Sequence, residues 1–148
     1  MRVRHRNRMR IVCIGPGDVV FHAGLLALTE EAVDDHIDSI AEGIRGHHLL
    51  LLPDRGFPMR LAERHTGEIT AIAPLQDTVF GTAHLQLDAY PDVIDTSTWY
   101  AQNMLHCLFG DAILMLGSSL GSMGELVDGF YIRKLLLRKK RGVDVGIG

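Results

Sequence analysis

The sequence has few cysteines and no long apolar run. Its 148 residues include only two cysteines, Cys13 and Cys107, too few for a disulfide framework, and neither belongs to a Cys-x-x-Cys zinc motif. The longest apolar runs, such as Leu49 to Pro53 and Ala112 to Leu116, are far shorter than the ~20 residues of a membrane helix. The Arg-rich start lacks a small-residue cleavage site, which indicates no signal peptide. We therefore expect a cytoplasmic protein with reduced thiols and no membrane partner.

Basic residues are scarce in the body of the chain. Residues 11–132 contain four basic side chains and 17 acidic ones, whereas the other Lys and Arg residues lie in the first ten residues and in 133–141. Apolar residues make up 47 % of the chain and charged residues 22 %, as in ordinary soluble domains, which excludes extensive disorder. The length fits one domain, which we place at residues 10–148.

Residues 1–9 form a separate basic segment. Arginine alternates there with residues that offer no apolar face, so we expect a disordered arm. Three interpretations stay open: Met9 is the true start, the arm makes non-specific electrostatic contacts, or it neutralises nucleic-acid phosphates. We give the last the least weight and do not count nucleic acid among the expected partners.

Apolar runs alternate with helical patterns along the rest of the chain. Runs bounded by Gly or Pro predict buried strands at 10–14, 49–52, 68–73 and 111–116, with shorter candidates at 93–94 and 143–147. Apolar residues at helical spacing predict helices at 32–44, 58–63, 97–109 and 122–140, while 75–91 has mixed periodicity and is expected to be irregular. This alternation predicts an α/β fold: three-layer, Rossmann-like, with a doubly wound and mainly parallel sheet.

Ligands of such folds bind at the carboxyl ends of the strands, where loops lead into helices. After the first strand, Gly15-Pro16-Gly17-Asp18 either lets the backbone approach a ligand closely or forms an ordinary tight turn. After the second strand, Arg55 either reaches a phosphate or pairs with Asp54 or Asp18. Candidate ligand-binding residues here are Gly15, Gly17, Asp18 and Arg55.

A third loop, Gly117 to Glu125, joins an apolar strand to a long helix. Free backbone N–H groups and the positive end of the helix dipole favour an anion there, and serine hydroxyls add donors. No Lys precedes Ser122, so the loop is not a Walker motif. The alternative is a helix cap, with Ser122 as N-cap and Glu125 closing a capping box. The candidate phosphate-binding residues of this loop are Gly117, Ser118, Ser119, Gly121 and Ser122.

The segment Asp111 to Glu125 resembles the motif of the Lonely Guy (LOG), or lysine decarboxylase-like, proteins. They belong to a wider group of Rossmann-like nucleotide-binding proteins that includes the molybdenum-cofactor carrier-like proteins. In LOG proteins a strand beginning Ser-Asp-Ala leads into Pro-Gly-Gly-x-Gly-Thr-x-x-Glu, and here Gly110-Asp111-Ala112 leads into Gly117-Ser118-Ser119-Leu120-Gly121-Ser122-Met123-Gly124-Glu125. The order of elements matches from residue 10 onward, including Leu49 to Ala62 and Glu68 to Pro74.

The resemblance implies a nucleotide-binding protein, usually a homodimer, and LOG proteins hydrolyse the N-glycosidic bond of nucleoside 5′-monophosphates. It also implies a catalytic role for Glu125, which matches the glutamate of the motif. The Arg-Lys pair that LOG enzymes carry on the preceding helix falls on Gln102 and Asn103. Because an amide cannot replace a guanidinium charge, the resemblance supports nucleotide binding better than hydrolysis.

The remaining reactive residues suggest no further chemistry. The eight histidines show no His-x-x-x-His helix pair, so we expect no metal, and we expect no cofactor. Cys107 is expected to be a buried apolar residue. Trp99 and Tyr100 either stack on a base or pack in the core, and Gln102 and Asn103 are further candidates for base contacts.

Three functions remain in view. The chain is a LOG-like protein that binds a nucleotide or phosphorylated nucleoside, a nucleoside-monophosphate phosphoribohydrolase, or an interaction protein with a vestigial pocket. We expect a two-fold homodimer through the long C-terminal helix and the helix that begins near Trp99, because their apolar residues exceed what one sheet face covers.

Overall fold

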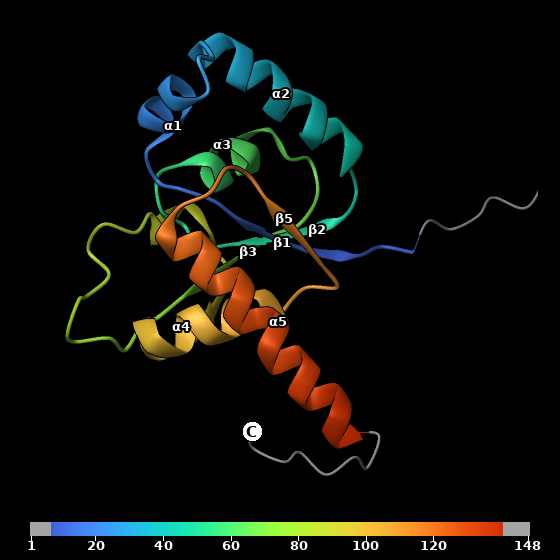
Figure 1. The fold of residues 1–148 in the computed structure, drawn as a ribbon, viewed down its shortest axis with the longest axis vertical. Coiled ribbons are helices and arrows are strands. Elements are labelled where there is room, and N and C mark those ends of the chain that lie inside the picture. Colours follow the sequence, from blue (N-terminus) through green and yellow to red (C-terminus); the bar gives the residue numbers. More distant parts are fainter. Residues whose placement is uncertain (1–6, 141–148) are drawn as a thin grey trace, which may run out of the picture.

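Five parallel strands form one sheet in the order β4-β3-β2-β1-β5 (Figure 1). The computed structural model describes residues 7–140. The elements are β1 (Arg10–Ile14), α1 (Val19–Leu25), α2 (Glu30–Gly43), β2 (His48–Leu51), α3 (Phe57–Arg64), β3 (Ile69–Ala73), the 3₁₀ turn η1 (Leu87–Ala89), β4 (Val93–Asp95), α4 (Trp99–Leu105), the 3₁₀ turn η2 (His106–Leu108), β5 (Ala112–Met115) and α5 (Leu120–Lys140).

Strand β1 lies between β2 and β5 in the sheet. Val12 is in register with Leu50 of β2 on one side and with Ile113 of β5 on the other. Because every pair is parallel, the carboxyl ends of the strands lie at one edge of the sheet, and the loops after β1, β2 and β5 meet there.

Two apolar clusters cover the two faces of the sheet. Alternate strand residues such as Cys13 and Leu51 pack against α1, α2 and α3. Their neighbours, such as Val12 and Leu50, face η2 and α5. Figure 1 shows α1–α3 on one side of the sheet and α4 and α5 on the other. The three-layer, Rossmann-like α/β architecture predicted from the sequence is therefore confirmed.

The predicted helices and strands within residues 7–140 are present, most of them with shifts of one or two residues at their ends. Helix α1 was not predicted, because its short segment has no polar face and contains Gly24. The Asp18 carboxylate begins this helix by accepting a hydrogen bond from the Phe21 N–H at 2.9 Å. The predicted strand at 143–147 and residues 1–6 of the predicted arm lie outside the described residues.

The last residues of the predicted arm contact the body of the protein. Arg8 forms an ion pair with Glu68, and the Met9 N–H donates to Nδ1 of His47 at 3.1 Å. These contacts anchor the segment that enters β1 at the edge of the sheet opposite the loops after β1, β2 and β5.

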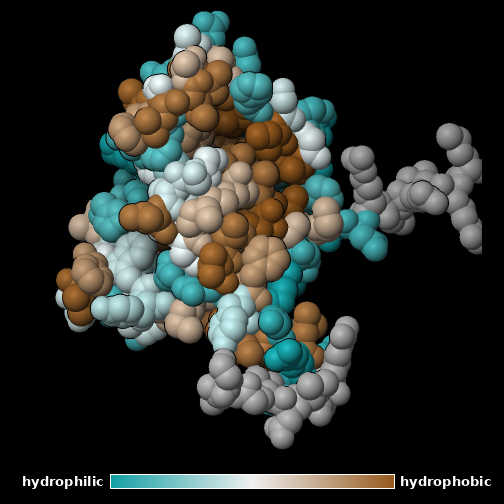
Figure 2. Space-filling view, in the orientation of Figure 1, coloured by the Kyte–Doolittle hydropathy of each residue, from teal (hydrophilic) through white to brown (hydrophobic). Residues whose placement is uncertain are grey.

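Apolar side chains also reach the surface. Figure 2 shows them gathered over α1 and between α2 and β5. An apolar groove of about 300 Å³ lies there, with Leu26, Ile37 and Leu116 among its lining residues. None of the helices within residues 7–140 has the length and apolar character needed to cross a membrane.

Candidate functional site

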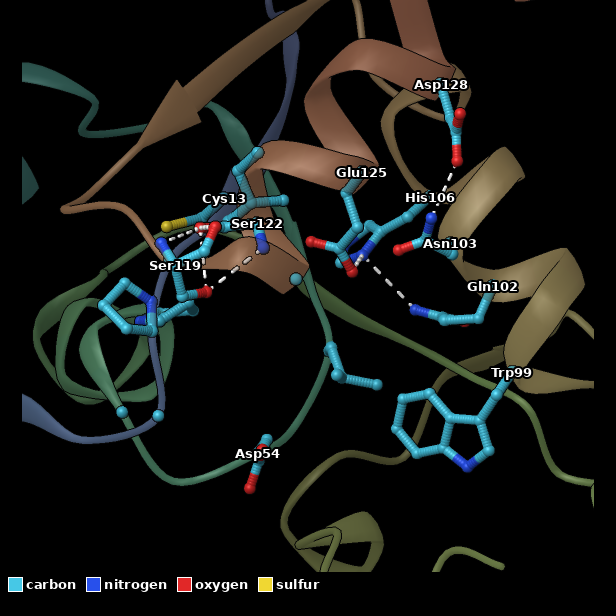
Figure 3. Close-up of a pocket in the computed structure, with 18 of the residues that line it drawn as sticks. Cys13, Asp54, Trp99, Gln102, Asn103, His106, Ser119, Ser122, Glu125 and Asp128 are labelled. Carbon is cyan, nitrogen blue, oxygen red and sulfur yellow. Dashed lines mark hydrogen bonds and ion pairs between the residues drawn. The ribbon is translucent and has the colours of Figure 1, made fainter. Parts of the chain in front are cut away.

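A cavity of about 640 Å³ lies at the carboxyl edge of the sheet (Figure 3). Its walls come from the loops after β1 and β2, from α4 and η2, and from the first turns of α5. The lining residues are Cys13, Ile14, Gly15, Pro16, Gly17, Leu52, Asp54, Gly56, Pro58, Trp99, Tyr100, Gln102, Asn103, Met104, His106, Ser119, Gly121, Ser122, Glu125 and Asp128.

Helix α5 begins with a reciprocal serine cap. The Ser119 N–H donates to Oγ of Ser122 at 2.8 Å, and the Ser122 N–H donates to Oγ of Ser119 at 3.2 Å. The predicted capping box of Ser122 and Glu125 is therefore wrong, because the cap forms one turn earlier. Both hydroxyls serve the cap, and Glu125 is left to point into the cavity (Figure 3).

The same cap leaves backbone N–H groups free at the start of α5. Within residues 7–140, the backbone N–H groups of Leu120 and Gly121 have no hydrogen-bond acceptor. A Cβ at Gly121 would meet no atom closer than Oγ of Ser119, at 3.8 Å. The positive end of α5 therefore faces open space at the cavity mouth.

Two other glycines in the loops are required by packing. A Cβ at Gly15 would lie 2.3 Å from the Leu116 carbonyl oxygen, and one at Gly56 would lie 2.4 Å from that of Pro16. These glycines let the loops after β1, β2 and β5 touch one another, which brings the cavity walls together.

Glu125 contacts a buried histidine that the sequence analysis did not single out. Oε1 of Glu125 lies 3.1 Å from Nδ1 of His106, and only 14 % of the Glu125 side chain and 1 % of the His106 side chain are exposed. The other ring nitrogen of His106, Nε2, is buried without a partner within residues 7–140. Gln102 and His106 are four residues apart and therefore share one face of a helix, which was the sequence signal for this histidine. Metal-ligand spacing among the histidines does not reveal it.

The two amides proposed as base contacts have protein partners. Gln102 is buried, and its amide contacts Thr96, the carbonyl of Ile72 and His106. The Asn103 amide donates to Oδ2 of Asp128 at 2.7 Å. Both line the cavity, but neither offers a free positive charge where LOG enzymes have Arg and Lys.

The cavity is acidic. Asp54, Glu125 and Asp128 line it, and no Lys or Arg is among the lining residues within the described chain. Arg55 is exposed and lies on a neighbouring surface hollow with Asp18, outside the cavity lining. It forms no ion pair with Asp54 or Asp18 within residues 7–140.

The structure thus separates the predicted site residues into two groups. Gly15, Gly17, Ser119, Gly121 and Ser122 line the cavity, together with Glu125, Trp99, Gln102 and Asn103. Asp18, Arg55, Gly117 and Ser118 lie outside it. Gly117 and Ser118 instead border the apolar groove beside α1, where the Ser118 carbonyl accepts a hydrogen bond from His22.

Trp99 forms one wall of the cavity, and contacts with Gly81 and His84 fix the position of its ring. Its indole N–H donates to the Gly81 carbonyl at 2.8 Å, and the ring of His84 stacks on it with centroids 5.5 Å apart. Asp77 ties the connecting loop to α4, and backbone N–H groups of Phe80 and Trp99 lower the pKa of its carboxyl. Tyr100, in contrast, is 71 % exposed and packs edge-on against Phe80.

Neither cysteine is poised as a nucleophile. Burial raises the pKa of the Cys13 thiol well above its ordinary value. Burial, with a smaller contribution from the Glu125 carboxylate, raises the pKa of Cys107 to about 12. No group of three His, Cys, Asp or Glu side chains within residues 7–140 is arranged to hold a metal ion.

Comparisons with known proteins bear on the fold. No family model and no curated protein sequence matches the chain. A solved structure that it resembles is the molybdenum cofactor binding protein from the phototrophic bacterium Rippkaea orientalis, with a TM-score of 0.60 and 20 % identity. The match covers 87 % of this chain and 74 % of that one. At this identity the similarity shows the fold, and it agrees with the carrier-like part of the resemblance noted above.

Proposed function

We propose that the cavity binds a nucleotide or a related phosphorylated nucleoside. The observation that carries the proposal is the start of α5, where the N–H groups of Leu120 and Gly121 have no acceptor within residues 7–140 and Gly121 lines the same cavity as Trp99. A volume of about 640 Å³ is in the range of sites for small molecules and cofactors.

The phosphate of such a ligand lies against the first turn of α5 and the Gly15–Gly17 loop. Charge-assisted hydrogen bonds from backbone N–H groups hold it there, since no lining Lys or Arg within the described residues does so. The heterocycle lies against Trp99, whose ring is already fixed by Gly81 and His84. The acidic remainder of the lining makes binding depend on salt.

Hydrolysis of the N-glycosidic bond is the second candidate function. Glu125 lies where it could stabilise a positive ribosyl centre, which favours this candidate. The departing base, however, receives no help from a lining Arg or Lys in the described part of the chain. Binding with little or no turnover is therefore the function that the cavity supports best, and a purely vestigial pocket is the remaining alternative.

The structural neighbour suggests a second ligand of similar chemistry. That protein is described as a molybdenum cofactor binding protein. A phosphorylated pterin, like a nucleotide, combines a fused heterocycle with a phosphate group. The start of α5 and Trp99 serve either ligand. An experiment therefore has to distinguish a nucleotide from a phosphorylated pterin as the ligand.

A thermal-shift screen tests the proposed function. AMP, GMP and a phosphorylated pterin are compared with adenosine and guanosine, and ligand at a hundredfold excess over Kd stabilises by about 2.7 kcal/mol. We expect a phosphorylated probe to raise Tm and its unphosphorylated counterpart to raise it less. If no phosphorylated probe raises Tm, the proposed function is wrong.

We further propose that two copies associate through α4 and α5. Exposed apolar side chains run along these packed helices, among them Met104, Met123, Val127 and Phe130. A two-fold pairing of this face would bury them.

Free thiols at Cys13 and Cys107 fit a reducing compartment such as the cytoplasm.

A further inference from the structure

Buried polar contacts connect Ile72 and Thr96, through Gln102 and His106, with Glu125 in the cavity. The Ile72 carbonyl accepts from Nε2 of Gln102 at 3.2 Å, and the Thr96 hydroxyl donates to Oε1 of the same amide at 2.6 Å. The two contacts fix which end of the amide is the NH₂ group, since the flipped amide would set two oxygens against each other at Ile72. Gln102 therefore turns its NH₂ group toward His106, with Nε2 3.3 Å from Nδ1, and it can donate there only if Nδ1 carries no proton.

The state of His106 follows from its partners. Nδ1 lies 3.1 Å from Oε1 of Glu125, closer than the Gln102 amide, and a hydrogen bond to a carboxylate is stronger than one to a neutral group. The proton therefore belongs on Nδ1, and the Gln102 contact with Nδ1 is then not a hydrogen bond. Nε2 is buried and has no partner within residues 7–140, so an imidazolium would bury an unpaired charged N–H, which is costly.

Glu125 connects His106 with the cavity. When Nδ1–H of His106 donates to Oε1 of Glu125, Oε2 is free to accept a hydrogen bond from a ligand. The other lining carboxylates, Asp54 and Asp128, add acceptors, and Asp128 already takes a hydrogen bond from Asn103. This part of the cavity therefore offers acceptors and suits a ligand that brings donors.

We propose that Glu125, positioned by His106 as a hydrogen-bond acceptor, selects ligands that present hydrogen-bond donors to it, a guanine-type N–H edge or a ribose hydroxyl. The proposal rests on the proposed function and names the ligand chemistry of that site. A carboxylate pairs well with the adjacent ring N–H and amino group of guanine, whereas hypoxanthine lacks the amino donor. His106 is a positioning residue, because it is fully buried and acts through Glu125.

Matched nucleotides distinguish the two donor sources. Affinities for GMP, IMP and 2′-deoxy-GMP are measured by calorimetry in wild type, in Glu125→Gln and in the exposed-carboxylate control Glu63→Gln. If the guanine ring donates to Glu125, we expect wild type and the control to bind GMP about 10- to 100-fold more tightly than IMP. If the ribose donates instead, we expect the same preference for GMP over 2′-deoxy-GMP. Glu125→Gln should lose that preference. A preference that is absent in wild type, or unchanged in Glu125→Gln, overturns the proposal.

The role of His106 is tested by two substitutions and by a spectrum that needs no ligand. His106→Asn keeps an N–H donor near the position of Nδ1 and should retain the preference, whereas His106→Leu should lose it. In ¹⁵N NMR of the free protein at pH 7, we expect the His106 proton on Nδ1. The exposed His36 ring serves as the reference spectrum of a histidine in water. A proton on Nε2 overturns the positioning role. If no nucleotide binds wild type but the Nδ1–H form is seen, the proposed function has failed and the His106–Glu125 pairing has not.

Discussion

Replacing Gly121 by valine places an isopropyl group over the first turn of α5. A Cβ there meets nothing closer than 3.8 Å, so the side chain projects into the cavity mouth without displacing protein atoms. It covers the N–H groups of Leu120 and Gly121, to which we assign the phosphate. Hydrogen bonds to charged groups contribute about 1.5–3 kcal/mol each, so losing two costs at least about 3 kcal/mol, or roughly a hundredfold in Kd.

The fold should tolerate the same change. Valine is a few tenths of a kcal/mol better than glycine inside a helix, and the position is sterically open, so the free energy of unfolding should change by less than about 1 kcal/mol. Gly43→Val is the matched control, because a Cβ at Gly43 meets nothing within 4 Å and this glycine lies outside the cavity lining.

Calorimetric titration with AMP or GMP at fixed salt, together with thermal unfolding of the free variants, separates the two effects. A Kd for Gly121→Val within threefold of wild type would show that phosphate does not rest on α5. A loss of several kcal/mol in the free protein would show that Gly121 serves the fold instead.

Four further predictions follow from the same structure. Release of adenine from AMP, followed by chromatography, should be absent or about 10²–10³-fold below an ordinary phosphoribohydrolase, since one well-placed charge is missing; ordinary rates that vanish in Glu125→Ala would contradict this. Sedimentation should show a dimer at micromolar concentration and a monomer for Phe130→Asp, whose side chain is 62 % exposed in one copy; a monomeric wild type refutes the dimer. Gly129→Ala should lower the urea-derived stability by about 1–3 kcal/mol, because its Cβ would lie 2.5 Å from that of Cys107; an unchanged midpoint would show that α5 shifts freely. The lowered pKa of Asp77 means that its contribution to stability is present above pH 4 and lost as pH falls through the folded-state value, so acid unfolding should be less steep in Asp77→Asn; equal acid sensitivity would contradict the assignment.

The sequence predicted the fold well because most residues of β1, β2 and β3 are buried on both faces of the sheet. Continuous apolar runs such as Leu49–Leu51 leave little choice of structure, and Gly or Pro ends each run. Helix α1 escaped prediction because exposed Phe21 and Leu25 break the usual amphipathic pattern. Its stability comes from the Asp18 cap and from packing of Val19 and Ala23 on the sheet.

The site was harder to predict, since it depends on where one helix starts. Ser119 and Ser122 are both good capping residues, and only the structure shows that they cap each other. That one-turn difference releases Glu125 from the helix end and brings it to His106. The partner of Glu125 is far from it in sequence, so no local spacing identified the pair.

The most direct test of the central claim is an NMR titration of ¹⁵N-labelled protein with AMP or GMP. The account predicts the largest shifts at the backbone N–H groups of Gly17 and Gly121 and at the indole N–H of Trp99, which line one cavity. Shifts confined to the α1–α2 groove, or no shifts at millimolar nucleotide, would contradict it.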